Sequence, residues 1–314
     1  MAPLKKIVWV GAGRLSLPLL KRVAATEKFT IKLLVRNLST YSSLPSGLAS
    51  AHQVDYSDHK ALVNHLRGQD IVIVFTSLVP GNGHDIKHIA LINAAIDAGV
   101  QYFIPSEWAL DSAGVMGSTN ERYGPTLPTD MVLAPKRTSH NYLLSRAAEG
   151  KIKFAAVYPG VMFEISFQNG SFRFDVATRA ACLADDGINP FPATTLGTLS
   201  RVIMSLFANP ALISNRFYHV IDGVLTQQEV FRALEKESRV PWTRTSYSTK
   251  EVRANAVKNM QKGIFGLQEY ADSLMTPFFG GLQVFSKIDN ELLGVGFGEV
   301  ELRNEVERVV RALL

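Results

Sequence analysis

The chain has 314 residues, of which 46% are hydrophobic and 19% are charged, a composition that excludes a largely disordered protein. The formal net charge of +5 comes from scattered basic residues, so a nucleic-acid-binding stripe is not indicated, whereas a site for an anionic ligand is compatible. The single cysteine, Cys182, excludes both a disulfide within the chain and a zinc site made of cysteines.

The N-terminus, MAPLKK, runs directly into an apolar strand pattern and lacks the regions of a secretory signal peptide. No apolar stretch approaches the length of about 18 residues that a membrane-spanning helix needs. We therefore expect a cytoplasmic protein, a monomer or a homodimer, that binds a small molecule and has neither nucleic acid nor membrane as a partner.

Short apolar runs alternate with helical patterns through the first half of the chain. The runs predict strands at residues 7–10, 31–35, 53–55, 70–75, 102–104 and 154–158. The patterns between them predict helices at residues 60–66, 85–98 and 139–148. Strands joined by helices at this spacing pair in parallel with right-handed crossovers. The expected fold class is α/β, with a doubly wound parallel sheet of the Rossmann type.

The second half of the chain has a less regular pattern. Residues 109–135 are rich in glycine and proline and show little periodicity, and loops of this kind are often functional. Further helices are predicted at residues 198–208, 226–238, 250–265, 267–274 and 299–314. We expect a dinucleotide-binding domain over residues 1–157. Over residues 158–314 we expect a smaller mixed α/β lobe, mainly for the substrate, with some segments returning to the first domain.

A glycine-rich turn follows the first predicted strand and opens a helix, which is where a dinucleotide fingerprint must lie. Gly11 permits the tight turn, and Gly13 lets the backbone approach a pyrophosphate that rests on the helix N-terminus. Ser16 takes the third position, where a small residue still permits close packing. This part of the cofactor site is assigned to Gly11, Gly13, Arg14, Leu15 and Ser16. A tight turn without a ligand is the alternative interpretation.

Arg36 directly follows the second predicted strand. NAD-binding sites place an acidic residue about 20 residues after the glycine turn, to hold the ribose 2′-hydroxyl, but no Asp or Glu occurs between Lys28 and Ala51. An arginine here suits the 2′-phosphate of NADP, which is the expected cofactor. A solvated surface arginine is the alternative. Thr76 and Ser77, after the predicted strand 70–75, are assigned to the same cofactor site.

Two further segments carry polar residues beside predicted strand ends. Residues 103–108, FIPSEW, end a strand, and ligands of such sheets bind beyond the carboxyl ends of the strands. Lys136 precedes a predicted helix, and desolvation can lower the pKa of a lysine so that it acts as an acid or a base. His140, four residues later, shares its helix face. On spacing alone, a strand-end turn and a surface lysine are equally compatible.

Together these residues resemble the NmrA-like and isoflavone-reductase-like branch of the atypical short-chain dehydrogenases, over about residues 4–240. The most specific element, YFIPSEW at residues 102–108, is similar to the family's RFIPSEFG. The glycine turn, Arg36 and Lys136 match the family's phosphate-binding loop, its 2′-phosphate-binding arginine and its catalytic lysine. The chain departs from the family at Ser16 and Ala109, where the family has glycine.

The resemblance implies roles for further residues. Lys136 is expected to be catalytic and also to contact the cofactor. Residues 158–163 resemble the family element that borders the nicotinamide, with ordinary core as the alternative. To the cofactor site this adds Tyr158, Pro159 and Gly160. The residues expected beside the substrate are Glu107, Trp108, His140 and Phe163.

The function implied by the resemblance is an NADPH-dependent reductase that acts on a hydrophobic, aromatic small molecule of secondary metabolism. Two alternatives remain open: a redox-neutral cyclase or isomerase that retains NADP, and a regulatory protein that senses the dinucleotide without consuming it. The presence of Lys136 favours an enzyme over a sensor. It does not separate a reductase from a redox-neutral enzyme, because a positioned lysine serves both.

Two other patterns carry no assignment. Tyr56 and Lys60 have the spacing of the Tyr-x-x-x-Lys motif of ordinary short-chain dehydrogenases, but they precede the fourth strand instead of following the fifth. His84 and His88 are spaced as metal ligands on a helix. No third ligand is evident beside them, so no metal is expected.

Overall fold

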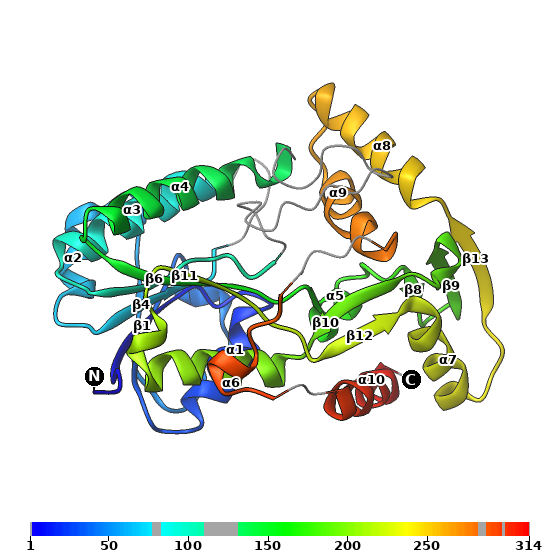
Figure 1. The fold of residues 1–314 in the computed structure, drawn as a ribbon, viewed down its shortest axis with the longest axis horizontal. Helices are drawn as coiled ribbons and strands as arrows, with labels where there is room; N and C mark the ends of the chain where they lie inside the picture. Colours follow the sequence, from blue (N-terminus) through cyan, green and yellow to red (C-terminus); the bar gives the residue numbers. More distant parts are fainter. Residues whose placement is uncertain (1, 77–82, 110–130, 282–286, 297–298, 314) are drawn as a thin grey trace.

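The structure, a computed structural model, describes residues 2–76, 83–109, 131–281, 287–296 and 299–313. Ser77 and most of the loop expected over residues 109–135 lie outside the described residues. The described chain forms two parts, one around a large sheet and one around two small sheets (Figure 1). The α/β fold class with a doubly wound parallel sheet is confirmed.

The large sheet has seven parallel strands in the order β11-β6-β5-β4-β1-β2-β3. The strands are β1 (Lys6–Val10), β2 (Thr30–Val35), β3 (Leu48–Gln53), β4 (Ile71–Val74), β5 (Tyr102–Ile104), β6 (Lys153–Tyr158) and β11 (Arg216–His219). The run IVIV of β4 is buried along its whole length, as a strand covered on both faces requires. The strand order reverses between β1 and β4, and such folds bind ligands beyond the carboxyl ends of the strands at this point.

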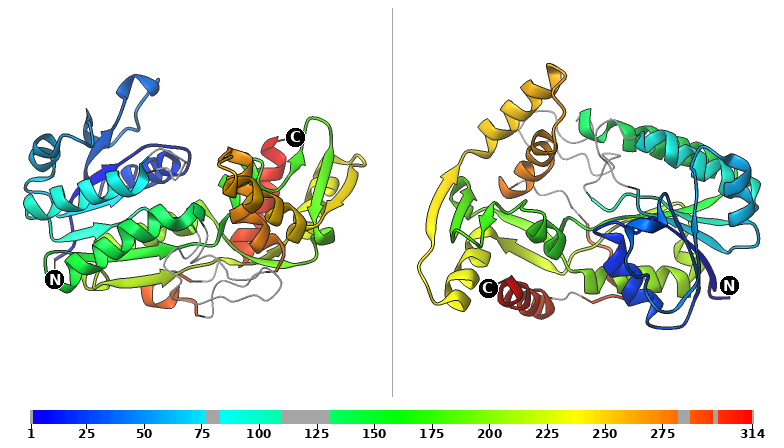
Figure 2. Two further views of the ribbon diagram at one scale, coloured as in Figure 1. Left: turned by 90° about the horizontal axis from the view of Figure 1, so that it is seen from above. Right: turned by 180° about the vertical axis from the view of Figure 1, so that it is seen from behind.

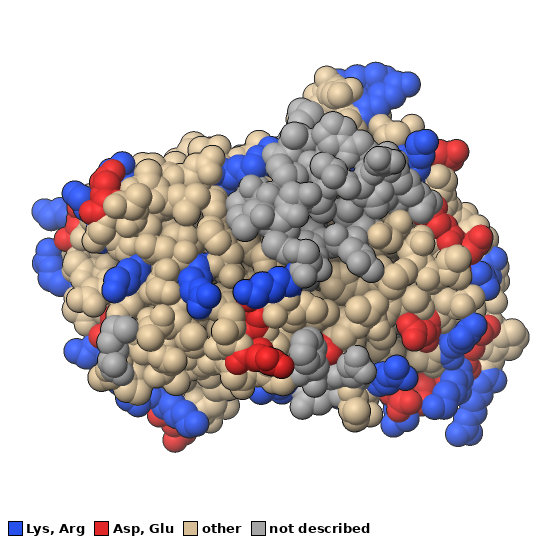
Figure 3. Space-filling view, viewed as in Figure 1, with Lys and Arg blue, Asp and Glu red and all other residues tan. Residues whose placement is uncertain are grey.

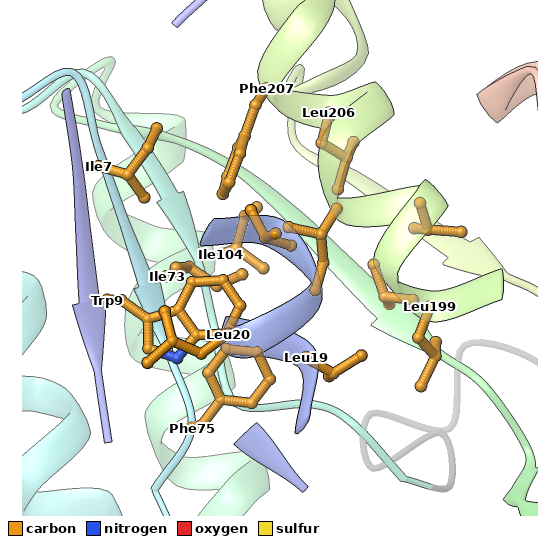
Figure 4. Packing of buried hydrophobic residues seen from close by; sticks show 14 of the residues in the cluster. Ile7, Trp9, Leu19, Leu20, Ile73, Phe75, Ile104, Leu199, Leu206 and Phe207 are labelled. Carbon is orange, nitrogen blue, oxygen red and sulfur yellow. The ribbon is translucent and has the colours of Figure 1, made fainter. Parts of the chain in front are cut away.

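Helices cover both faces of the large sheet (Figure 1). On one face lie α2 (His59–Leu66), α3 (His84–Asp97) and α4 (Ala134–Ala148), and on the other α1 (Ser16–Ala24) and α6 (Leu196–Ala208). Figure 4 shows the second face, where Leu19 and Leu20 of α1, Leu199 and Phe207 of α6 and Trp9 of β1 belong to one apolar cluster. Each face therefore has its own apolar core, and β1 and β4 are fixed between them.

The second part of the molecule is built from short strands and helices (Figure 2). One small sheet has the order β12-β10-β7 and the other the order β13-β9-β8. Their strands are β7 (Val161–Met162), β8 (Phe174–Asp175), β9 (Ala180–Ala184), β10 (Pro190–Thr194), β12 (Gly223–Thr226) and β13 (Thr243–Tyr247). The helices are α5 (Phe163–Gln168), α7 (Gln227–Ser238), α8 (Thr249–Gln261), α9 (Leu267–Phe279) and α10 (Glu299–Leu313). A cluster rich in phenylalanine forms its core.

The chain passes between the two parts more than once. Strand β11 pairs with β6 and helix α6 packs against α1, although both follow the segment that enters the small sheets. Leu133, in the short 3-10 helix at Met131–Leu133 before α4, is buried in the core of the second part. The start of α4 thus lies at the junction of the two parts. We keep the division near residue 157 as a proposal.

Several predicted boundaries differ from the structure. The third strand was expected at residues 53–55 but lies at Leu48–Gln53, because this edge strand is only half-buried and carries a weak apolar pattern. Helix α4 begins at Ala134, earlier than the expected 139, with Pro135 in its first turn, where no backbone donor is lost. Lys136 is therefore inside the helix and not before it.

None of the helices among the described residues is long and apolar enough to span a bilayer. On the face shown in Figure 3, Lys and Arg side chains lie interspersed with Asp and Glu.

Candidate cofactor and active site

Gly11 and Gly13 form the turn between β1 and α1, and their surroundings differ. Gly11 has a φ of +91°, and a Cβ there would lie 2.5 Å from the carbonyl oxygen of Phe75. A Cβ on Gly13 would meet no atom within 4 Å, so its backbone faces open space. Helix α1 starts without a side-chain cap and without an acidic residue in its first turn. The turn therefore offers backbone donors to an anion.

Ser16 takes the third position of the turn and is almost fully buried. Its hydroxyl donates to the carbonyl oxygen of Gly11 at 2.7 Å and accepts from the indole nitrogen of Trp9 at 2.7 Å. The hydroxyl thus closes the turn and pairs a buried N–H that a glycine would leave without this acceptor. The departure from glycine at position 16 is explained by the tryptophan on β1.

A cavity of about 400 Å³ opens above the glycine turn, at the point where the strand order reverses. Its lining includes two cationic and four hydroxyl side chains but no carboxylate among the described residues. The lining residues are Gly11, Ala12, Gly13, Val35, Arg36, Asn37, Thr40, Tyr41, Tyr56, Phe75, Thr76 and Lys87. Such a cavity suits a ligand with several negative charges and hydroxyl groups.

Arg36 and Lys87 supply the positive charge of this cavity. Burial lowers the pKa of Lys87, and the charge of Arg36 lowers it further, because the two cations repel each other. Burial raises the pKa of Tyr56 to about 12, and Arg36 opposes that rise. An anionic group between these side chains relieves the repulsion of the two cations.

The sequence pointed to Arg36 but missed Lys87 and Tyr56. Lys87 comes from α3, and only the packing of that helix brings it to the strand that precedes Arg36. Tyr56 belongs to the Tyr-x-x-x-Lys pattern, whose position in the sequence argues against a catalytic role. The structure places it in the cavity lining, apart from the lysine of that pattern, Lys60, which is exposed on α2.

Ser106, in the FIPSEW element after β5, links this cavity to the start of α4. Its hydroxyl donates to the carbonyl oxygen of Thr76 at 3.0 Å, and its backbone N–H donates to Nε2 of His88 at 3.2 Å. Its carbonyl oxygen accepts a hydrogen bond of 2.6 Å from Nζ of Lys136. Thr76 lines the cavity, so one residue connects the lysine with the cavity wall.

Lys136, Glu107 and His140 form a buried polar cluster beside Ser106. Their side chains are 4%, 2% and 1% exposed, which makes charge pairing essential. Nζ of Lys136 lies 3.8 Å from Oε2 of Glu107, and Nδ1 of His140 lies 3.5 Å from Oε1 of the same carboxylate. Burial lowers the pKa of Lys136, while the charge of Glu107 opposes that change.

His88 and His84 stack on each other on α3, with ring centroids 4.9 Å apart. Burial lowers the pKa of His88 well below its ordinary value, with further lowering by His84, Lys136 and His140. A neutral ring leaves Nε2 free of a proton to accept the backbone N–H of Ser106, which gives this histidine a structural role. Among the described residues, no group of three His, Cys, Asp or Glu is arranged to hold a metal.

The other predicted site residues lie deeper in the protein. The indole of Trp108 is stacked on Phe75, at 4.7 Å between centroids, and donates to the carbonyl oxygen of Val74. Tyr158 belongs to the core under α3 and α4, and Phe163 belongs to the phenylalanine core of the second part. These three side chains do not line the 400 Å³ cavity.

Pro159 and Gly160 connect β6 to β7, and both are buried. Gly160 has a φ of +64°, and a Cβ there would lie 3.0 Å from the carbonyl oxygen of Pro192. Arg14 and Leu15 lie in the turn before α1, where Arg14 is exposed. The roles assigned to these residues stay predictions.

Residues 11–163 match the model of a family of NAD(P)H-binding domains. The match begins at the glycine turn and includes Arg36, Ser106 and Lys136, so it covers the residues that form the cavity and the buried cluster. The open backbone at Gly13 and the two cations of the cavity fit a nicotinamide dinucleotide. The cofactor class expected from the sequence is thus confirmed.

Similar proteins include oxidoreductases of fungi and bacteria and a reductase of a plant. "Oxidoreductase aprR" of Aspergillus flavus is 27% identical over 259 residues, 82% of each chain. A structure of "AtPrR2 with NADP+ and (+)pinoresinol" is 16% identical, covers 100% of both chains and has a TM-score of 0.72. The NADPH complex of the quinone oxidoreductase QOR2 of Escherichia coli is 20% identical, covers 96% of this chain and 99% of its own, and has a TM-score of 0.69. The expected resemblance to the isoflavone-reductase-like family agrees with these findings.

Proposed function

Because residues 11–163 form an NAD(P)H-binding domain, we propose that this chain is an NADPH-dependent reductase of a hydrophobic, aromatic small molecule. The oxidoreductase class rests on this domain and on oxidoreductase relatives that match four fifths of the chain. The observation that carries the proposal is the buried Lys136, whose ammonium group is tied through Ser106 to a wall of the cofactor cavity.

The residues of the first part have separate tasks in this proposal. The turn from Gly11 to Ser16, with Arg14 and Leu15, receives the pyrophosphate at the start of α1. Arg36 and Lys87 receive the 2′-phosphate, which makes NADPH the preferred cofactor over NADH. NADPH, when bound, supplies a hydride. Lys136 supplies the proton that completes the reduction of the substrate.

The proposed class of substrate is supported by similar proteins and by the position of Lys136. One structure with the same fold holds the aromatic compound pinoresinol, and another belongs to a quinone oxidoreductase. The start of α4 lies at the junction of the two parts, beside the core rich in phenylalanine. An aromatic substrate with a carbonyl, an alkene or a benzylic position suits these surroundings. A role in secondary metabolism is part of the proposal.

The test is a set of NADPH oxidation assays with a panel of aromatic carbonyl compounds, quinones and alkenes, in which product is counted against NADPH consumed. We expect equal amounts of both. Lys136→Met should lower kcat at least about 100-fold while NADPH still binds, because a general acid contributes about that much. Lys60→Met, at the exposed lysine of α2, is the control.

Two results contradict the proposal. Product formed without loss of NADPH indicates a redox-neutral enzyme, which uses the same lysine without transfer of a hydride. Full activity in Lys136→Met shows that the lysine takes no part in the reaction.

A further inference from the structure

Glu107 lies between two bases that the same helix presents. Lys136 and His140 are one turn apart in α4, so their side chains point to the same side of that helix. Each contacts a different oxygen of the carboxylate, Nζ of Lys136 at 3.8 Å from Oε2 and Nδ1 of His140 at 3.5 Å from Oε1. The carboxylate therefore lies between the two side chains, at a depth where its side chain is 2% exposed, and within the described part of the chain Nδ1 of His140 has no other hydrogen-bond partner.

The charges around Lys136 make Glu107 decisive for its protonation. Among the described residues, the titratable groups that face Lys136 are Glu107 after β5, His140 on its own helix, and His88 on α3, beside which His84 is stacked. Of these only Glu107 is negative. Burial favours the neutral amine, so the carboxylate is the group that keeps the proton on the lysine.

The direction of the lysine is fixed by a different contact. The short hydrogen bond of Lys136 goes to the carbonyl oxygen of Ser106, at 2.6 Å, whereas Glu107 stands further away. A carbonyl oxygen orients the ammonium group, and a carboxylate at 3.8 Å supplies charge without taking the proton in a tight bond.

We propose that Glu107 and His140 are positioning residues for the reaction of Lys136: Glu107 keeps its ammonium group charged, and His140 holds the second carboxylate oxygen in place. This inference rests on the proposed function, in which Lys136 donates a proton. It differs from the expectation that Glu107 and His140 contact the substrate, because here both act through the lysine.

The direct test is the pKa of Lys136, measured by NMR titration of the lysine side chains in the NADP⁺-bound protein labelled with ¹³C-lysine. Lys136→Met identifies the resonance. Glu107→Gln should lower the pKa of Lys136 by roughly one to three units, because an opposite charge within this distance shifts a pKa by that amount. Glu107→Asp keeps the charge and should restore most of the wild-type value.

His140→Phe is the second variant, and it preserves the ring packing of His140 on Phe217, where the centroids are 5.1 Å apart. We expect a lower kcat with KM changed less than about twofold, since the substrate does not touch His140. A KM that rises with kcat unchanged places His140 against the substrate and overturns its part of the inference.

The pH dependence of kcat/KM gives an independent readout. A lysine that acts as an acid is active when protonated, so activity falls as pH rises through its pKa. Glu107→Gln should move this basic limb to lower pH by the same amount as the NMR shift. If the wild-type protein consumes no NADPH, the proposed function fails while the titration still decides the inference. An unchanged pKa of Lys136 in Glu107→Gln overturns the inference whatever the activity.

Discussion

Single residues at the mouth of the cofactor cavity show which part of the site could be predicted from sequence. Gly11, Gly13 and Arg36 were found because each stands at a fixed distance from a predicted strand. Lys87 was missed because it enters the cavity from α3, and no local pattern marks it. The sequence predicts that the serine at position 16 is a tolerated replacement, whereas the structure shows that its hydroxyl accepts a hydrogen bond from the indole of Trp9.

If Arg36 and Lys87 bind the 2′-phosphate, their removal should weaken the binding of NADP⁺ much more than that of NAD⁺. Arg36→Ala and Lys87→Ala should each weaken NADP⁺ binding by roughly 10- to 100-fold, because a hydrogen bond to a charged group contributes about 1.5–3 kcal/mol. NAD⁺, which lacks the 2′-phosphate, should lose less than about threefold. Titration calorimetry with both dinucleotides measures this, with Lys60→Ala as the control. Equal losses for NADP⁺ and NAD⁺ rule out contact of these side chains with the phosphate.

Helices and strands could be predicted where apolar residues recur regularly along the chain. Strands that pair with partners far away in the sequence could not. The strands β1, β2, β4, β5 and β6 each follow an apolar run, so the doubly wound sheet followed from their alternation with helices. The strands of the second part have only two to five residues and were not found. For example, β13 pairs in parallel with β9, a contact that no local signal indicates.

Three helices of the molecule meet at a pair of carboxyl groups, Glu164 of α5 and Glu305 of α10. The carboxylate of Glu164 accepts from the backbone N–H of Leu196, at the start of α6, at 3.0 Å. The pKa of Glu164 is raised to about 7, mainly by burial. Backbone hydrogen bonds oppose this rise, whereas the hydrogen bond and repulsion with Glu305 add to it. Burial acts to raise the pKa of Glu305 as well, but hydrogen bonds with Arg308 and Glu164 outweigh it and lower that pKa.

This pair predicts how stability depends on pH. Because the pKa of Glu164 rises from 4.5 to about 7 on folding, its stabilising contribution is complete below about pH 4.5 and is lost as pH rises to about 7. Glu164→Gln should remove this loss, which amounts to about 3 kcal/mol in the free energy of unfolding. Urea unfolding at about pH 5 and about pH 8 measures it. Glu291→Gln, at an exposed glutamate, is the control. Equal pH dependence in Glu164→Gln and wild type contradicts the assignment.

In the molecule as a whole, the residues of the candidate site lie at the edge where the large sheet faces the second part. The glycine turn follows β1, the FIPSEW element follows β5, and α4 starts at the junction between the parts. The sequence predicted Lys136 through its family resemblance, and it placed Glu107 and His140 near the same site. It could not show that all three are buried together, because that depends on how α4 packs against the end of β5.

The most direct test of the account is a crystal structure of the protein with NADP⁺. We predict that the pyrophosphate contacts backbone N–H groups of the turn from Gly11 to Ser16, with the 2′-phosphate within hydrogen-bond distance of both Arg36 and Lys87. The cavity at the switch point of the sheet then holds the adenosine half of the cofactor. A dinucleotide bound elsewhere, or a cavity left empty at saturating NADP⁺, contradicts the account.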